Sequence, residues 1–368
     1  MKKFDIAAYI WPAYTGKEER AWRFWPDKIG EWETVKTSTK KFEGNDWPRK
    51  PVWGYQDEAD PVVMEQQIEE AISHGVNVFI YDWYWYDNLP FLENCLNDGF
   101  LQAKNNEKMQ FYIMWANHDA YDMWDKSVAD PDNLTKVWSG EVDRKTFDML
   151  VHRWINEYFS KKNYYKIGGC PLFSIYDMSN LVNGLGGLEK TREALEYFRE
   201  EVKKAGFNDL HLQMILTDSR FVDISGVDGS EKIDERVLMK ALKIDSFTHY
   251  QFVHFAQVNK GYERLLSDVK KEQARVLSEY DIPYFPHASV GWDNNPRTKK
   301  PLPYVATENT PENFVRALEL AKDYSEKHNT TPLITINSWN EWTETSYLEP
   351  DDKYGYGYLE AIKKVFKS

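Results

Sequence analysis

The chain has 368 residues, of which 42% are hydrophobic, and its formal net charge is −13. This acidic balance argues against a nucleic-acid partner, because phosphate binding requires clustered Lys and Arg, and no basic amphipathic stretch or run of about 18 apolar residues indicates a membrane. The two cysteines form no Cys-x-x-Cys pair, which excludes a zinc site of that kind. The 15 Trp and 23 Tyr are compatible either with stacking on sugar rings or with an aromatic core.

Short β-rich runs alternate with helical patterns along the chain, which is typical of parallel βαβ units. Eight runs are predicted as strands: Asp5–Ile10, Val76–Trp83, Gln110–Trp115, Pro171–Tyr176, His211–Leu216, Ser246–Gln251, Tyr284–Val290 and Leu333–Ser338. Several are nearly continuous apolar runs, as expected for strands that are buried on both faces. No Gly-x-Gly-x-x-Gly follows the first strand, which weighs against a dinucleotide fold. We therefore predict an α/β fold, a (β/α)8 TIM barrel that forms a single domain over residues 1–368.

Helical patterns fall between the predicted strands. The clearest begins after Asp60, a suitable N-cap, with Pro61 at the first helical position and Gly75 at the C-terminal cap. The other patterns cover Arg144–Lys161, Leu188–Lys204, Lys232–Leu242, Tyr262–Tyr280, Pro311–Glu326 and Gly357–Phe366.

The beginning of the chain resembles the basic region of a signal peptide for only three residues, and the apolar run that follows stops at Pro12. We interpret this run as a barrel strand. The expectation is a protein that is cytoplasmic, or one that is exported and has lost its leader.

The connection between the first two strands, residues 12–60, is unusually long. Loops of more than about 12–15 residues without regular structure are uncommon and usually functional. This one is rich in aromatic residues: Tyr14, Trp22, Trp25, Trp32, Trp47, Trp53 and Tyr55. We expect it to decorate the C-terminal face of the barrel.

Active sites of such barrels lie at the C-terminal ends of the strands, so the polar and aromatic residues just past each strand are candidates. The residues predicted to bind substrate are Asp82, Trp83, Trp85, Trp115, Asn117, His118, Tyr176, His249, Tyr250, Trp292, Asp293, Trp339 and Asn340. Carboxylates, amides and aromatic rings recur among them, with few cations. This mixture suits hydrogen bonding to hydroxyls and stacking on sugar rings.

Glu341 and Glu344, which follow the last predicted strand, are the predicted catalytic pair. Glycoside hydrolysis usually needs two carboxyl groups, one acid and one base or nucleophile. Their separation of three residues leaves the geometry open, because they would point to opposite faces in an extended strand but could converge in a tight turn. The spacing alone therefore does not distinguish retaining from inverting chemistry.

Other chemistries find little support. The eight histidines form no His-Glu-x-x-His or His-x-x-x-His pattern, and no Gly-x-Ser-x-Gly nucleophile elbow is present. Asp130-Pro131-Asp132 matches the Asp-x-Asp of metal-dependent glycosyltransferases, but Pro131 indicates a turn. We predict neither a metal nor a cofactor.

The last part of the chain resembles a known family. Trp339-Asn340-Glu341-Trp342-Thr343-Glu344, followed by Tyr347-Leu348-Glu349-Pro350-Asp351, is similar to the C-terminal signature of the WbsX-like proteins. These proteins are related to glycoside hydrolase family 99, the endo-α-mannosidases and endo-α-mannanases. Gly30-Glu31-Trp32, Trp115-Ala116-Asn117 and Gly291-Trp292-Asp293-Asn294 extend the resemblance along the chain.

The resemblance implies a barrel enzyme without a metal requirement that acts on an oligosaccharide or polysaccharide. Glu341 would be the base that assists the 2-hydroxyl of the substrate, giving a 1,2-anhydro sugar and net retention, and Glu344 would be the acid. Mannose is the sugar that this kinship favours. The WbsX branch was named for a glycosyltransferase of surface-polysaccharide synthesis, which is the alternative together with a non-catalytic glycan-binding barrel. Neither the sugar linkage nor the oligomeric state follows from the residues.

Overall fold

A computed structural model describes residues 3–217, 220–226 and 229–367. Parallel strands form the barrel in the order β12-β9-β8-β4-β2-β1-β14-β13. A parallel bridge between Phe247 and Tyr284, just before β13, joins the two ends of this order. The barrel strands are β1 (Asp5–Ile10), β2 (Val78–Tyr86), β4 (Gln110–Trp115), β8 (Cys170–Ile175), β9 (His211–Leu216), β12 (Ser246–His249), β13 (His287–Ser289) and β14 (Leu333–Asn337). The predicted (β/α)8 TIM barrel is confirmed.

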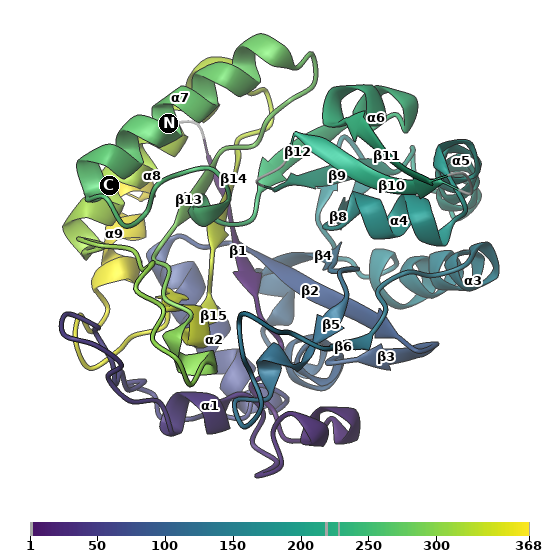
Figure 1. The fold of residues 1–368 in the computed structure, drawn as a ribbon. Helices are drawn as coiled ribbons and strands as arrows, with labels where there is room; N and C mark the ends of the chain where they lie inside the picture. Colours follow the sequence, from purple (N-terminus) through teal and green to yellow (C-terminus); the bar gives the residue numbers. More distant parts are fainter. Residues whose placement is uncertain (1–2, 218–219, 227–228, 368) are drawn as a thin grey trace.

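Helices surround the strands (Figure 1). The longer ones are α2 (Pro61–His74), α3 (Arg144–Trp154), α5 (Leu188–Lys204), α7 (Tyr262–Glu279), α8 (Pro311–His328) and α9 (Gly357–Phe366). The shorter ones are α1 (Trp32–Lys36), α4 (Met178–Gly184) and α6 (Glu235–Ala241). The predicted limits of α2 are confirmed, because the Asp60 carboxylate accepts from the backbone amide of Val62 and Gly75 ends the helix with φ +108°.

The predicted helix from Lys232 is wrong at its start. Residues 229–234 form β11 (Gly229–Asp234), which pairs in antiparallel register with β10 (Phe221–Gly226). The helix α6 begins only after Asp234, whose side chain caps it by accepting from the amide of Arg236.

Shorter elements complete the structure. The remaining strands are β3 (Leu89–Phe91), β5 (Ala120–Tyr121), β6 (Lys136–Trp138), β7 (Lys166–Ile167), β15 (Asn340–Glu341) and β16 (Ser346–Tyr347). The 3-10 turns are η1 (Glu19–Arg23), η3 (Phe100–Gln102), η4 (Asn106–Lys108), η5 (Asp122–Trp124), η7 (Phe252–His254), η8 (Asn295–Arg297) and η9 (Trp342–Glu344), and the π-helical turns are η2 (Cys95–Gly99) and η6 (Ile155–Phe159). No helix in the described ranges is both long and apolar enough to cross a membrane.

The long connection after β1 folds into a layer that contains η1 and α1. Its aromatic residues Tyr14, Trp25, Trp32 and Trp47 are buried, and Trp32 packs against Tyr14 and against Trp342. Much of the aromatic content of this loop therefore stabilises the loop itself, by burial of large apolar surfaces against the C-terminal segment.

The interior of the barrel carries a hydrogen-bonded polar layer. The hydroxyls of Thr248 on β12 and Thr335 on β14 lie 2.9 Å apart, and Thr335 also lies 2.9 Å from Nδ1 of His287 on β13. Buried polar groups cost free energy unless they are paired, so a shift of one strand against another would leave these groups unpaired. The hydrogen bonds of this layer therefore fix the arrangement of three neighbouring strands.

Candidate active site

A tight hairpin after β14 brings Glu341 and Glu344 together. β15 and β16 pair Glu341 with Ser346, and the 3-10 turn η9 between them ends at Thr345 with φ +53°. The Glu341 amide donates to Ser338 Oγ (2.8 Å). The turn therefore replaces the extended geometry in which residues three apart would point to opposite faces.

Arg297 connects the two glutamates. Its Nη1 donates to Glu344 Oε1 (2.9 Å), and its Nη2 lies 3.8 Å from Glu341 Oε1. Glu31 holds the other side of the guanidinium, with Nε to Oε1 at 2.8 Å and Nη2 to Oε2 at 3.2 Å. One buried cation thus faces the buried carboxylates of Glu31 and Glu341 and the partly buried carboxylate of Glu344.

Arg297 and Glu31 are absent from the residues predicted for the site. Arg297 lies on η8, three residues beyond Gly291-Trp292-Asp293-Asn294, and Glu31 lies within Gly30-Glu31-Trp32. Both motifs carried the family resemblance. Their position in or near these two motifs was the signal that could have identified them. The ion pair between Arg297 and Glu31 spans 266 positions in the chain, so no local sequence pattern indicates it.

Tyr250 bridges Asp82 and Glu341. Its hydroxyl lies 3.0 Å from Asp82 Oδ2 and 3.0 Å from Glu341 Oε2. A phenol has one proton and cannot donate to both carboxylates at once, so the arrangement is satisfied when one of the carboxyl groups is protonated. Burial, and then the charge of Glu341, raise the pKa of Asp82 well above its ordinary value. The surroundings therefore favour the proton on Asp82.

The two glutamates have different electrostatic surroundings. Burial raises the pKa of Glu341, but Arg297 and hydrogen bonds from Tyr250 and Asn337 act against this rise. Burial followed by the charge of Glu341 raises the pKa of Glu344 well above its ordinary value, and only Arg297 opposes the shift. The environment therefore favours a charged Glu341 beside a protonated Glu344.

A cavity of about 270 Å³ lies over these groups. Its lining is Trp11, Asp82, Tyr84, Met114, Ala116, His118, Met123, Trp124, Tyr176, Tyr250, Arg297, Glu341 and Glu344. Glu344 Oε2 is buried and has no hydrogen-bond partner among the residues that the structure describes. Carboxyl groups thus meet aromatic walls in one cavity, which suits a hydroxyl-bearing ring.

Of the residues predicted to bind substrate, Asp82, His118, Tyr176 and Tyr250 line this cavity. Burial lowers the pKa of His118, and its Nδ1 lies 2.8 Å from the carbonyl oxygen of Asp119. A neutral His118 can offer one ring nitrogen to a hydroxyl group.

The tryptophans Trp83, Trp85 and Trp115 do not line the cavity. Successive side chains of a strand point to opposite faces, so Asp82 and Tyr84 face the interior while Trp83 and Trp85 face the helices. Trp83 and Trp115 both pack against Trp154 of α3.

Four further candidates also lie outside the lining. Asn117 exchanges hydrogen bonds with the backbone of Asp177, and His249 Nε2 lies 3.4 Å from Glu272 of α7. Asp293 accepts from Asn45 and Asn295. Trp292 is half-buried, and its carbonyl accepts from the amide of Ala306.

Trp339 and Asn340 lie behind the glutamates. Asn340 Nδ2 donates to both carboxylate oxygens of Glu58 (3.0 and 2.8 Å), and its Oδ1 accepts from the amide of Trp11. Trp339 Nε1 donates to Gln67 Oε1. These two side chains support the segment that carries Glu341 and Glu344, and they do not line the cavity.

Two buried carboxyl groups, Glu58 and Glu349, meet in this supporting layer. Gln67 Nε2 donates to both, at 3.3 and 2.9 Å, and Trp342 Nε1 donates to Glu349 (2.6 Å). Burial raises the pKa of Glu58 to about 8. Asn340 and Trp342 flank Glu341 in the sequence, so this layer holds the segment on both sides of Glu341.

We expect Glu58→Gln to reduce the pH dependence of stability. A folded-state pKa above the unfolded value makes the stabilisation fully present below the unfolded pKa and lost as pH rises through the folded pKa. Between about pH 5 and pH 8 the free energy of unfolding should therefore fall less in Glu58→Gln than in the unmodified protein, as measured by urea unfolding. Identical slopes would contradict a protonated Glu58.

We expect Trp115→Phe to lower the free energy of unfolding by roughly 0.5–3 kcal/mol without changing KM, because Trp115 packs only in the core. Trp124→Phe is the matched control, since Trp124 lines the cavity and its truncation should raise KM. Thermal unfolding and steady-state kinetics measure both effects. A raised KM in Trp115→Phe would contradict the placement of Trp115.

No group of three His, Cys, Asp or Glu side chains in the described residues could hold a metal ion.

Known proteins share both sequence and fold with this chain. A sequence model of the family described as Glycosyltransferase WbsX matches residues 6–362. The uncharacterized protein WxcX of Xanthomonas campestris pv. campestris (strain B100) is 24% identical over 375 residues, which cover 98% of this chain and 49% of that protein. This chain spans about half the length of the curated relatives that it matches.

Among solved structures, the GH99 endo-α-mannosidase from Bacteroides thetaiotaomicron superposes with a TM-score of 0.57 at 14% identity, covering 98% of this chain and 95% of that chain. A glycoside hydrolase-like protein superposes with a TM-score of 0.61 at 15% identity, covering 100% and 95%. These structures show a shared fold. By the match over residues 6–362, this chain belongs to the WbsX family.

Proposed function

We propose that this chain is a glycoside hydrolase that cleaves an α-mannoside-like bond in an oligosaccharide or polysaccharide with retention. The observation that carries the proposal is the pair Glu341 and Glu344 in one cavity, bridged by Arg297 and differing in environment. A charged carboxylate beside a protonated one is the arrangement that acid–base catalysis needs.

In the proposed first step, Glu341 takes the proton of the substrate 2-hydroxyl. The freed oxygen attacks C1 and forms a 1,2-anhydro sugar, while Glu344 gives its proton to the leaving oxygen as the C1–O bond breaks. In the second step, the Glu344 carboxylate takes a proton from water, whose oxygen attacks C1 as the bond between C1 and the 2-oxygen breaks. The 2-oxygen then recovers its proton from Glu341, which restores both groups.

The cavity walls support a sugar in this position. Aromatic rings of Trp11, Tyr84 and Trp124 offer faces for C–H groups, and His118 and Asp82 offer hydrogen bonds to hydroxyls.

The family description favours a second candidate, a glycosyltransferase of surface-polysaccharide synthesis. Hydrolase and transferase activity are distinguished by incubating the protein with defined polysaccharides, including α-mannans, and measuring the reducing ends that form. Thermal shift with GDP-mannose and UDP-glucose runs in parallel. Hydrolysis predicts new reducing ends without a shift. A shift with either nucleotide sugar and no new reducing ends would support the transferase and contradict the hydrolase.

A further inference from the structure

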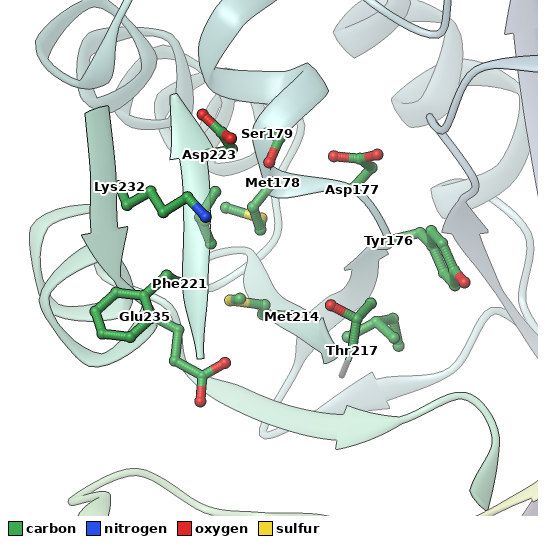
Figure 2. A pocket seen from close by; sticks show the side chains of 12 residues that line it. Tyr176, Asp177, Met178, Ser179, Met214, Thr217, Phe221, Asp223, Lys232 and Glu235 are labelled. Atoms are coloured by element: carbon green, nitrogen blue, oxygen red, sulfur yellow. The ribbon is translucent and has the colours of Figure 1, made fainter. Parts of the chain in front are cut away.

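A second cavity, of about 300 Å³, lies beside the catalytic one at the C-terminal ends of β8 and β9 (Figure 2). Its lining is Tyr176, Asp177, Met178, Ser179, Met214, Ile215, Thr217, Phe221, Val222, Asp223, Lys232 and Glu235. Tyr176 lines both cavities and forms the wall that they share. A molecule seated over Glu341 and Glu344 thus has this space as its neighbour.

The second cavity lies between the ends of barrel strands and elements outside the barrel sheet. α4 packs against β10, and the hairpin β10–β11 forms the outer wall. Figure 2 shows the amine of Lys232 directed from β11 into the space near Met178. Asp177 caps α4 by accepting from the amide of Asn180 (2.9 Å), which anchors the opposite wall.

The lining groups are those that recognise a sugar. Thr217 and Ser179 supply hydroxyls, Lys232 supplies a donor, and methionine side chains form an apolar floor. Phe221 is 52% exposed and contributes an aromatic ring to the lining, and such a ring can contact the C–H groups of a sugar.

The charged side chains that line the second cavity restrict the class of sugar that it can bind. The carboxyl groups of Asp177, Asp223 and Glu235 outnumber the amine of Lys232 in this cavity. Like charges placed a few ångströms apart repel strongly where water is partly excluded. A sugar that carries a carboxylate or phosphate is therefore disfavoured in this cavity.

We propose that the second cavity binds an uncharged sugar residue adjacent to the one whose bond is cleaved, so that the preferred ligand has at least two consecutive uncharged sugars. This inference rests on the proposed function. It places specificity in Thr217, Phe221 and Lys232, which do not touch the catalytic glutamates.

The test measures binding to the Glu341→Gln variant, in which turnover is slowed. The method is calorimetric titration with methyl α-mannoside and with a panel of α-linked mannobioses. We expect at least one mannobiose to bind at least tenfold more tightly than the monosaccharide. Adding Thr217→Val, Phe221→Ala and Lys232→Met should reduce this gain to below threefold without changing the affinity for methyl α-mannoside.

Thr330→Val is the matched control, because Thr330 is exposed and lies before β14, at the opposite end of the barrel. It should leave the gain intact, and circular dichroism should show that every variant remains folded. Equal affinities for the mono- and disaccharides, or a gain that survives the three changes, would overturn this inference alone. Absence of binding by every mannoside would contradict the proposed function and this inference together.

A disaccharide of glucuronic acid and mannose tests the charge argument. We expect it to bind at least tenfold more weakly than the best mannobiose. Equal or tighter binding would overturn the restriction to uncharged sugars.

Discussion

Glu341→Gln and Glu344→Gln should each reduce kcat by a factor of about 10²–10⁴, the typical contribution of a general acid or base. Glutamine keeps the size of the side chain but can neither take up nor release a proton at neutral pH. Both carboxyl groups line the same cavity, and no other glutamate among the described residues lines it. Steady-state kinetics on any glycan that the protein cleaves measures the effect.

The two variants should differ with the leaving group. If Glu344 is the acid, an aryl glycoside whose leaving group needs no proton should recover much of the first step in Glu344→Gln, but not in Glu341→Gln. Glu326→Gln, an exposed change on α8, is the control for handling and folding. Near-normal turnover in both cavity variants would contradict the assignment.

Arg297→Met should lower the free energy of unfolding by about 3–5 kcal/mol, the usual consequence of removing one partner from a buried ion pair. Arg297 is 4% exposed and is the cation that Glu31 and Glu344 contact directly. Without it, these carboxylates stay buried without a counter-charge. Guanidinium chloride unfolding, followed by circular dichroism, measures the loss.

Arg316→Met is the matched control, because Arg316 pairs with Glu263 at the surface, with side chains 42% and 80% exposed. Exposed pairs contribute roughly 0–1 kcal/mol, so this change should be nearly silent. Adding Glu31→Gln to Arg297→Met should restore part of the stability by removing one stranded charge. Equal losses in Arg297→Met and Arg316→Met would contradict the role of Arg297 as the central counter-ion.

The barrel could be predicted because buried parallel strands are visible as apolar runs. β1, β4 and β9 have the bounds that the sequence predicts, and α5 and α9 do as well. The hairpin β10–β11 was missed, since its register depends on pairing between neighbouring strands and its second strand runs into a helical pattern at Asp234.

The two glutamates could be predicted from their position after the last strand, but not their convergence. That depends on η9 and on the left-handed Thr345, which receives a hydrogen bond from Trp47 (2.8 Å) far away in the chain. Arg297 could not be predicted for the same reason, because its partner Glu31 belongs to another loop.

The aromatic residues near strand ends were the least informative about which side chains line the cavity. Three predicted tryptophans lie near the cavity but point toward α3: Trp83, Trp85 and Trp115. Three other aromatic residues line the cavity and were not among the predicted residues: Trp11, Tyr84 and Trp124. Tyr84 follows Asp82 by two residues, so strand alternation was the available signal for its inward direction. Trp11 and Trp124 lie outside regular barrel strands and carry no such signal.

The most direct test of the central claim is the anomeric configuration of the first sugar released, followed by proton NMR during cleavage of an α-mannan by the unmodified protein. Two acid–base glutamates and attack by the substrate 2-hydroxyl predict the α-anomer first, with the β-anomer growing in later by mutarotation. First release of the β-anomer would contradict retention through a 1,2-anhydro sugar, and cleavage that persists in the Glu341→Gln, Glu344→Gln double variant would contradict the site itself.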